Sequence, residues 1–403
     1  MPRALYAGLS GTLAHQTAID VIANNLANMS TVGYKERRTQ FSDCFYQTLR
    51  AGRGAASGQG LNPMQVGVGV RPASIAVLHT QGAIERTGQP LDAAIEGPGF
   101  FVVSDNGTRL LTRDGAFATD DAGHLILAST GARVLGWMAD DRGNIETSGE
   151  VSEITVPLGW TRPASATTQA AVSGNLDAGA EVGDSVYCSA VVYDSLGLEH
   201  PLRLAFTKTD VNEWQVDASC EGSTASTTLV FNSSGTAASG TTISLNVALT
   251  NGASTPQTIT ISLSSLTQRG AASTPAFTSQ DGHGTAQLQD VSITNDGIIL
   301  GTFSDGQTVA LAQLALANVP NVGGLQAVGN NMFAVGLASG QMSIGPAGTG
   351  NRGRIVPQSI ELSTVDVTRN FIELIQAERG FQANTRVIST ANRLLEDVLQ
   401  IIR

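Results

Sequence analysis

The sequence of 403 residues has little charge, few cysteines and no long apolar run. Only 14% of the residues are charged, and the net charge of −11 argues against a nucleic acid as the main partner. Because no run of about 18 apolar residues is present, no helix that inserts into a membrane is expected. Three widely spaced cysteines, Cys44, Cys188 and Cys220, are too few for the disulfide framework of a small secreted module, and whether Cys188 and Cys220 meet stays open.

Motifs that carry catalytic or cofactor chemistry are also missing. The five histidines lie far apart and share no metal-ligand spacing with the cysteines. The only lysines are Lys35 and Lys208, and neither follows a glycine, which excludes a phosphate-binding P-loop. Asp281-Gly282-His283-Gly284 could be imagined as an acid and a base, but its glycines favour a mobile turn. We therefore expect no cofactor, no metal site and no enzymatic activity.

The N-terminal end is predicted to be an amphipathic helix over residues 4–28. Apolar side chains recur there with a period near 3.6, at Leu5, Leu9, Leu13, Ile19, Ile22 and Leu26. The asparagines from Asn24 to Asn28 and then Gly33 favour the end of this helix and a turn. Because the pattern continues past Asp20, a cleaved secretory signal is not the favoured interpretation.

The C-terminal end gives the clearest helical signal. Ser363 or Thr364 is the expected N-cap, with Asp366 near the positive end of the helix dipole. From there, steps of four and three follow one row: Val367, Phe371, Leu374, Glu378, Phe381, Thr385, Ile388, Asn392, Leu395, Leu399 and Ile402. Eight of these eleven positions are apolar, and the three polar ones, seven residues apart, would fix register and partner choice. A second apolar row runs beside the first.

The two ends differ in length, and the difference predicts assembly. The shorter N-terminal helix can cover only part of one C-terminal row. A long helix with two apolar rows then needs further partners along its length, because burial of one row does not offset the entropy lost on ordering it. Other copies of the chain are the simplest such partners.

Between the ends the pattern changes to short apolar runs separated by turn residues. Asp105-Asn106-Gly107 and Asn295-Asp296-Gly297 are typical hairpin turns, so this part is predicted to be all-β. Residues 222–280 are rich in Ser, Thr, Gly and Ala and have Arg269 as their only charge; alternation favours an outer β-domain there, with disorder as the alternative. Residues 51–60 are predicted to be a flexible linker. Three isolated tryptophans, Trp137, Trp160 and Trp214, are expected in the core.

A small basic cluster, Lys35, Arg37 and Arg38, follows the first predicted helix. The plain interpretation is a solvated basic turn. The functional alternative is a charge contact between subunits.

The terminal motifs resemble the signatures of the bacterial flagellar rod and hook proteins. The resemblance rests on residues 24–35 (NNLANMSTVGYK), residues 378–390 (ERGFQANTRVIST), the block 91–102 and the stretches around 301–307 and 328–333. Departures from the usual pattern are Met29-Ser30, Thr364 and Glu378, which put particular contacts in doubt. The length and the large insertion are similar to the hook members, because rod members are shorter.

The resemblance implies a mainly β fold with α-helical termini and nested domains. The helices would pair as a coiled-coil-like inner layer, with two β-domains inserted between them. The implied boundaries are an inner polymerisation domain (1–30 and 364–403), a linker with extended and hairpin segments (31–70), a middle β-domain (71–145 and 285–363) and an outer β-domain (146–284).

The implied function is that of a structural subunit of the extracellular hook, which self-assembles into a curved tube and transmits motor torque to the filament. A distal rod component of the basal body is the alternative within the family, and a secreted β-rich adhesin is the alternative outside it. The implied partners are further copies of the chain, the distal rod below, the hook cap during growth and the hook–filament junction proteins above, with export that needs no cleaved signal. The expected assembly interface comprises Leu5, Leu9, Ile19, Asn24, Asn25, Leu26, Asn28, Gly33, Phe371, Leu374, Glu378, Phe381, Asn384, Thr385, Ile388, Asn392, Leu395 and Leu399.

Overall fold

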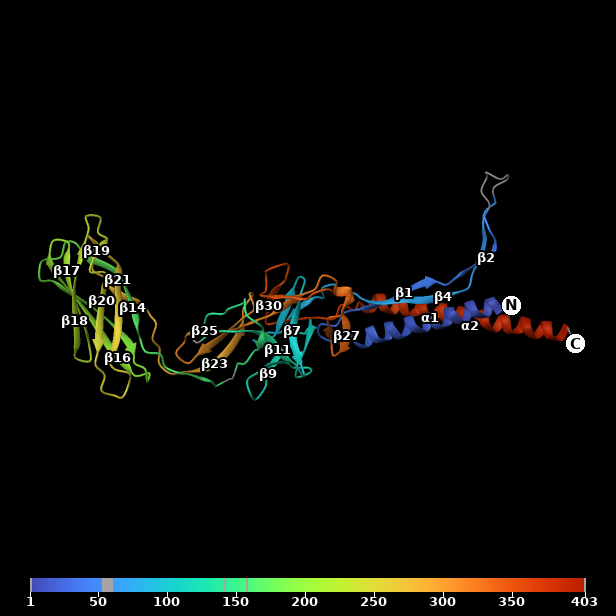
Figure 1. Ribbon diagram of the computed structural model, residues 1–403, viewed down its shortest axis with the longest axis horizontal. Coiled ribbons are helices and arrows are strands. Elements are labelled where there is room, and N and C mark those ends of the chain that lie inside the picture. Colours follow the sequence, from blue (N-terminus) through green and yellow to red (C-terminus); the bar gives the residue numbers. More distant parts are fainter. Residues whose placement is uncertain (1, 53–60, 141–142, 157–158, 402–403) are drawn as a thin grey trace. The chain divides into compact units, whose positions relative to one another are not determined.

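The computed structural model describes residues 2–52, 61–140, 143–156 and 159–401 and divides the chain into two compact units (Figure 1). The first unit comprises Met1–Pro157, Val291–Gly301 and Val309–Arg403. The second comprises Leu158–Asp290 and Thr302–Thr308. Most of the linker predicted at 51–60 lies outside the described residues. The predicted division into an inner domain, a linker, a middle domain and an outer domain stays a prediction. The first unit contains both helices together with the β-strands that precede and follow the second unit in sequence.

Helix α1 (Pro2–Ala27) and helix α2 (Val367–Ile401) pack side by side in the first unit (Figure 1). They run antiparallel, because Gly8 lies against Ile388 while Gly380, earlier in α2, lies against His15. Helix α2 has 35 residues and is therefore about 52 Å long at about 1.5 Å per residue. The predicted helical termini are confirmed.

The cap of α2 differs from the prediction. The carboxylate of Asp366 accepts a hydrogen bond from the backbone NH of Arg369 at 3.1 Å, so Asp366 is the N-cap. Thr364 instead accepts a hydrogen bond from the backbone NH of Glu36 at 2.8 Å. The prediction of Ser363 or Thr364 was wrong because Thr364 is engaged by the chain that leaves α1.

An extended segment follows α1 and returns along it. Strands β1 (Arg37–Asp43) and β4 (Val70–Val77) form an antiparallel ladder that packs on α1. Between them, β2 (Tyr46–Arg50) and β3 (Met64–Gly67) form a separate two-stranded ladder in which every residue is exposed. Both strands of this second ladder lie within residues 31–70.

The rest of the first unit is β-structure built from both sides of the insertion. Its largest sheet includes the run of neighbouring strands β25-β11-β7-β8-β28-β27, and the apolar core there includes Phe100, Val102, Leu111 and Trp137. Small ladders β6–β30 and β5–β31 join the segment before the sheet to the segment that leads into α2. The elements are β5 (Ile84–Arg86), β6 (Ala93–Glu96), β7 (Phe100–Asp105), β8 (Thr108–Thr112), β9 (Phe117–Thr119), β10 (Leu125–Leu127), β11 (Arg133–Met138), β12 (Ser152–Glu153), β25 (Thr308–Leu314), β26 (Leu316–Asn318), the 3₁₀ turn η2 (Val322–Gly324), β27 (Gln326–Gly329), β28 (Met332–Ala334), β29 (Ser343–Gly345), β30 (Arg354–Pro357) and β31 (Ser359–Glu361).

The second unit is built from two sheets around one apolar core. The sheet orders are β15-β16-β17-β18-β19 and β20-β21-β14-β22, and buried side chains alternate with exposed ones along most strands. The core includes Trp214, Phe206, Leu204 and Ile261, all fully buried. The elements are β13 (Thr161–Arg162), β14 (Gln169–Asp177), β15 (Ser185–Tyr193), β16 (Glu199–Asp210), β17 (Glu213–Cys220), β18 (Ser223–Phe231), β19 (Ala237–Ser239), β20 (Thr242–Val247), β21 (Gln257–Arg269) and β22 (Ala276–Gln280), with β23 (Ala286–Ile293) and β24 (Ile298–Phe303) where the chain passes between the units.

Three smaller predictions about the middle of the chain have different outcomes. The Ser- and Thr-rich stretch 222–280 is folded into strands, so the disorder alternative is wrong. Trp137 and Trp214 are buried, but Trp160 is 44% exposed and is not a core residue. The turn at Asp281 is fixed rather than mobile, because its carboxylate accepts hydrogen bonds from the backbone NH groups of Thr168 and Gln169 at 2.8 Å each. The structure also answers the open question about the cysteines, because Cys188 and Cys220 are both free thiols.

Candidate assembly surface

Helix α1 meets α2 through small side chains rather than through its leucines. Its buried positions are Gly8, Gly11, Ala14, Ala18, Ile22 and, at the end of the helix, Asn25, a stripe with steps of three and four. A Cβ atom at Gly11 would lie 2.5 Å from Oδ1 of Asn384, so a larger residue there would displace the Asn384 side chain. The seam brings the helices close together but buries little apolar area.

The leucines of α1 lie beside this stripe and remain accessible. Leu9 is 49% exposed and Leu13 is 55% exposed, while Leu5 is half-buried. Ile19 and Leu26 are half-buried and pack against the small cluster of Ala18, Ile22 and Ala377. The predicted N-terminal row is therefore divided between the seam and the surface.

The predicted C-terminal row divides into two stripes, each with a spacing of seven residues. Leu374, Phe381, Ile388 and Leu395 are half-buried, on the side of α2 where Ala377 and Ala391 are buried. The alternate members are all exposed: Phe371, Glu378, Thr385, Asn392 and Leu399. An ideal helix turns 3.6 residues rather than 3.5, but over this length both stripes stay distinct. One stripe thus serves the chain's own helix pair, and the other faces outward.

The asparagines at the end of α1 have unequal roles. Asn25 is 1% exposed and lies inside the unit: its Oδ1 accepts hydrogen bonds from the backbone NH of Arg37 at 3.0 Å and from the hydroxyl of Tyr34 at 3.2 Å. Its Nδ2 donates to Oδ1 of Asn370 at 3.2 Å. Asn370 in turn donates to Glu36 Oε1 at 2.9 Å. This buried network ties the end of α1 to the first turn of α2.

The other predicted interface residues in the motif 24–35 also make contacts within the chain. Asn24 is exposed, although its Oδ1 accepts a hydrogen bond from the Tyr34 hydroxyl at 2.9 Å. Asn28 is half-buried, and its Nδ2 donates to the carbonyl of Asn24 at 2.8 Å. Gly33 is buried with φ +68°, and a Cβ there would lie 2.8 Å from the carbonyl carbon of Arg113. The sequence signature is therefore a structural joint between the helices and the adjoining β-structure.

Lys35 belongs to a buried ionic triad next to this joint. Its Nζ lies 2.5 Å from Oε1 of Glu361, and Nη1 of Arg113 lies 3.1 Å from the other carboxylate oxygen. Burial lowers the pKa of Lys35, and the Glu361 carboxylate acts in the opposite direction. The pKa of the neighbouring His79 is lowered to about 4 by burial and by the charges of Lys35 and Arg113, so His79 is neutral at pH 7. Lys35 therefore does not make the predicted intersubunit contact.

A further exposed surface was not recognised in the sequence. The β2–β3 ladder carries Phe45, Tyr46, Leu49, Met64 and Val66, which are between 38% and 89% exposed. Large apolar residues on both sides of the predicted linker were the available signal. An isolated two-stranded ladder is only marginally stable in water, so this hairpin lacks a packing partner within the described residues.

Other kinds of site receive no support from the described part of the chain. None of its helices combines the length and hydropathy needed to cross a bilayer. No group of three or more His, Cys, Asp or Glu side chains in the described residues is placed to hold a metal ion.

Comparison with protein-family models gives four matches along the chain. Residues 5–35 match the flagella basal body rod protein family, and residues 94–173 match the flagellar hook protein FlgE/F/G D1 domain. Residues 184–283 match the flagellar basal body protein FlaE D2 domain, and residues 356–401 match the flagellar basal body rod FlgEFG protein C-terminal family.

Curated relatives extend the similarity to the whole length. The chain is 34% identical to the flagellar hook protein FlgE of Treponema pallidum and 33% identical to that of Borreliella burgdorferi, in each case over 100% of both chains. It is 33% identical to the Salmonella typhimurium protein over 98% of each chain. Because these alignments include the insertion, they favour the hook members over the shorter rod members.

A solved structure shows the same fold at low identity. The crystal structure of Helicobacter pylori flagellar hook protein FlgE2 aligns with a TM-score of 0.54 and 13% identity. The alignment covers 67% of this chain and 98% of that one.

Proposed function

The chain belongs to the flagellar hook protein family and is a structural subunit of the bacterial flagellar hook, and we propose that copies of it polymerise through the outward stripes of α1 and α2 and through the β2–β3 hairpin. The observation that carries this proposal is the stripe Phe371, Glu378, Thr385, Asn392 and Leu399, which is exposed along the full length of α2. Phe371 and Leu399 at its two ends, together with Ile372, Ile375 and Val398 at neighbouring positions, are large apolar side chains that are 41–67% exposed, and this exposure favours a second partner.

Under this proposal the predicted interface residues do two different jobs. Those in the seam and the joint, such as Asn25, Gly33 and Asn384, shape the subunit so that its outward stripes stand in register. The exposed ones, such as Leu9, Phe371 and Leu399, make the contacts between subunits. The mixture of apolar and polar positions on the outward stripe gives such contacts a preferred register, since a polar residue in an apolar seam selects its partner.

The hairpin supports the same proposal independently. Phe45 is 89% exposed and Tyr46 is 56% exposed, at the beginning of a ladder with two open faces. A large exposed apolar patch marks an interaction site in a soluble protein. In the polymer the hairpin would pack on a neighbouring copy and so gain the packing surface that an isolated hairpin lacks.

The second unit would supply the sliding surface of a curved tube that works as a universal joint. Ser and Thr are the commonest exposed residues of this unit, as along β18 and β20, where Ser226, Thr228 and Ser244 face outward. Many weak polar contacts can exchange at little cost while the shaft rotates, whereas a continuous apolar patch would lock neighbouring copies together.

The ends of the polymer would meet other flagellar proteins. We propose the distal rod below, the hook cap during growth and the hook–filament junction proteins above, and export of the chain without a cleaved signal. The similarity of residues 5–35 and 356–401 to basal body rod proteins supports a shared packing mode with the rod. An export assay on a chain with residues 1–30 replaced by an unrelated helix should show loss of secretion; unchanged secretion would contradict the export proposal.

Two deletions test which part drives polymerisation. Arg162 on β13 and Ala286 on β23 are direct partners in an antiparallel ladder. Replacing residues 163–285 by Asn-Gly would therefore close a hairpin and remove the core of the second unit. We expect this variant to form tubes in electron microscopy, whereas deletion of residues 364–403 leaves dispersed subunits. Tubes formed by the second variant would overturn the proposal.

A further inference from the structure

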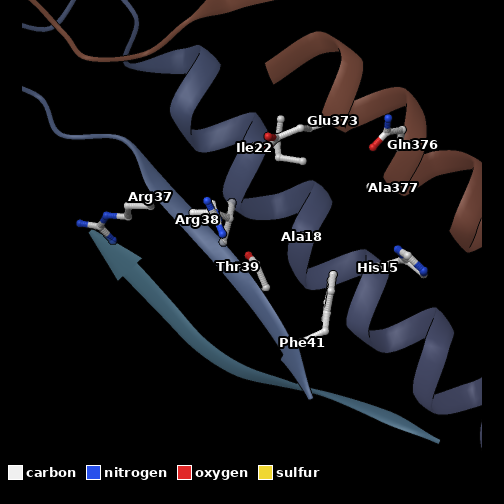
Figure 2. A pocket seen from close by; sticks show the side chains of 11 residues that line it. His15, Ala18, Ile22, Arg37, Arg38, Thr39, Phe41, Glu373, Gln376 and Ala377 are labelled. Atoms are coloured by element: carbon white, nitrogen blue, oxygen red, sulfur yellow. The ribbon is translucent and has the colours of Figure 1, made fainter. Parts of the chain in front are cut away.

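The groove between α1, α2 and β1 belongs to the helix surfaces that are already proposed to polymerise. Its volume is about 280 Å³, and Ala18, Ile22 and Ala377 form its apolar floor (Figure 2). Figure 2 also shows Arg37 directed away from this floor, so the charge of Arg37 selects no occupant there. The second unit offers a different surface, which the proposed function does not use.

Strand β15 is an open edge of the five-stranded sheet in the second unit. Within the described residues its ladder partner is β16, on one side. Strand β22 of the facing sheet passes near β15 but pairs with β14. β15 has nine residues, whereas β19, at the other edge of the same sheet, has three, and the edges of the facing sheet, β20 and β22, have six and five. β15 is therefore the longest edge of this two-sheet core.

This edge has none of the features that usually keep an exposed strand from pairing. Its sequence, SVYCSAVVY, contains no charged residue and no proline, and its register with β16 is regular over all nine residues, without a bulge. Charges, proline, bulges and short length are the usual protection of an edge. Tyr187 is 72% exposed and Val191 is 42% exposed, and Ser189 between them is exposed as well. Such a strand favours pairing with another strand.

The backbone groups of Tyr187, Ser189 and Val191 point out of the sheet at this edge. Tyr193 fixes their direction: its NH donates to Oγ1 of Thr167 and its carbonyl accepts from the NH of Thr167, at 2.9 Å each, on the side away from β16. Along a regular strand this direction alternates with a period of two residues. Positions 187, 189 and 191 therefore direct both NH and carbonyl groups outward, where no strand of the described residues pairs with them.

The edge is complementary to itself. When two copies of β15 lie antiparallel about a twofold axis at Ser189, this residue faces its own copy, and Tyr187 of each chain faces Val191 of the other. Each of these pairs exchanges two hydrogen bonds, which gives about six in total. An aromatic side chain opposite a β-branched one is a favourable cross-strand pair, and this register forms that pair twice.

We propose that free copies of the chain pair through β15 into an antiparallel dimer with twofold symmetry. The occupant of the edge is a second copy of the chain. This inference goes beyond the proposed function, because the contact is isologous, whereas heterologous contacts build a filament. Backbone pairing of this kind would also lock neighbouring second units together in a tube that has to bend as it rotates. The dimer is therefore an assembly of the free chain.

Substitution of Ser189 tests the pairing, because the twofold axis sets this residue against its own copy at a Cα separation of about 5.5 Å. One full-length variant carries Ser189→Lys and another carries Ser189→Glu. Each places like charges directly opposite each other, and we expect the dissociation constant of the dimer to rise by about tenfold or more. An equal mixture of the two variants pairs opposite charges and should dimerise within about threefold of the wild-type chain. Sedimentation velocity, at protein concentrations below those that give tubes, measures the dimer.

Two further variants separate the edge from other effects. Ser226→Lys adds the same charge at an exposed residue of β18, inside the same sheet, and should leave the dimer unchanged. Ser189→Pro removes an outward NH that β16 does not use, so it should prevent pairing while the second unit stays folded. Circular dichroism checks that each variant keeps its strands.

The outcomes distinguish the dimer from the proposed function. A wild-type chain that stays monomeric up to about 100 µM, or a mixture that does not recover, would overturn the dimer, and tubes of that chain would leave the proposed function standing. Electron microscopy should show tubes for every Ser189 variant. A variant that loses both dimer and tubes would overturn the assignment of this contact to the free chain. If the wild-type chain dimerises but never forms tubes, the proposed function fails and the dimer stands.

Discussion

The second unit and the paired helices solve the problem of burial in opposite ways. The second unit has a continuous core with large, fully buried side chains such as Trp214, Phe206 and Leu204. The helices share one small cluster of Ala18, Ile22 and Ala377, with Ile19, Leu26 and Leu374 partly buried around it. A unit with its own core folds alone, whereas a helix pair joined by small side chains depends on contacts outside itself. The difference predicts that the second unit is stable by itself and that the helix pair depends on assembly.

Amide exchange in the dilute monomer tests this difference in stability between the second unit and the helix pair most directly. We expect the amides of β16 and β17 to exchange at least about a thousandfold more slowly than those of α1 and α2, because local opening of the helices exposes little apolar surface. Mass spectrometry of exchanged peptides measures the ratio. In the assembled polymer the helices should become as protected as the strands. Equal protection of helices and strands in the monomer would contradict dependence on assembly.

A second test concerns how the helices are attached to the adjoining β-structure. Glu361→Gln leaves Lys35 and Arg113 buried without a carboxylate, which should destabilise this region by about 3–5 kcal/mol. The matched control is Glu150→Gln, because Glu150 pairs with Arg109 at 2.6 Å but is 82% exposed; its expected effect is at most about 1 kcal/mol. The urea dependence of amide exchange in β6 and β7 measures the change in stability caused by each substitution. Equal effects of the two substitutions would show that the triad does not anchor the joint.

The same contrast explains which features the sequence could reveal. A period near 3.6 over many residues identified both helices, and repeated Asn-Gly and Asp-Gly turns identified the β-region, because each signal is local. Glycine and alanine carry little hydrophobic signal, so the stripe from Gly8 to Ala18 was invisible while the neighbouring leucines stood out. The seam became apparent only when α2 was placed against it.

Long-range polar contacts were hidden for a different reason. Lys35 and Glu361 are 326 positions apart, so nothing in the order of residues marks them as a pair. Lys35 was grouped with Arg37 and Arg38 because the three residues are close in sequence. In the structure, however, Lys35 is buried and Arg38 is exposed. Burial depends on the path of the chain after α1, which turns Lys35 toward Glu361 and leaves Arg38 at the surface. Sequence proximity therefore predicted a cluster that the fold separates.

The smallest expected effect concerns pH and the stability of the second unit. His200 presents Nε2 to Asp194 at 3.2 Å and Nδ1 to Glu221 at 3.3 Å. Neutral imidazole can donate from only one nitrogen, so both contacts are satisfied only in the protonated ring. Burial acts to lower the pKa of His200, but the hydrogen bonds and charges of Asp194 and Glu221 outweigh it, and the net shift is upward.

Because the pKa of His200 is raised in the folded state, its contribution to stability is complete below the unfolded value of about 6.5 and is lost as the pH rises through the folded value. Asp194 does not titrate in this window. Burial raises its pKa, but hydrogen bonds from Asn251 and from the backbone NH groups of Leu196 and Leu198 contribute to lowering it to about 2. The melting temperature of the second unit followed by tryptophan fluorescence should therefore fall by about 2 °C or less between pH 6 and pH 9. The fall should be absent in His200→Gln, and a fall of the same size in both proteins would assign it to other groups.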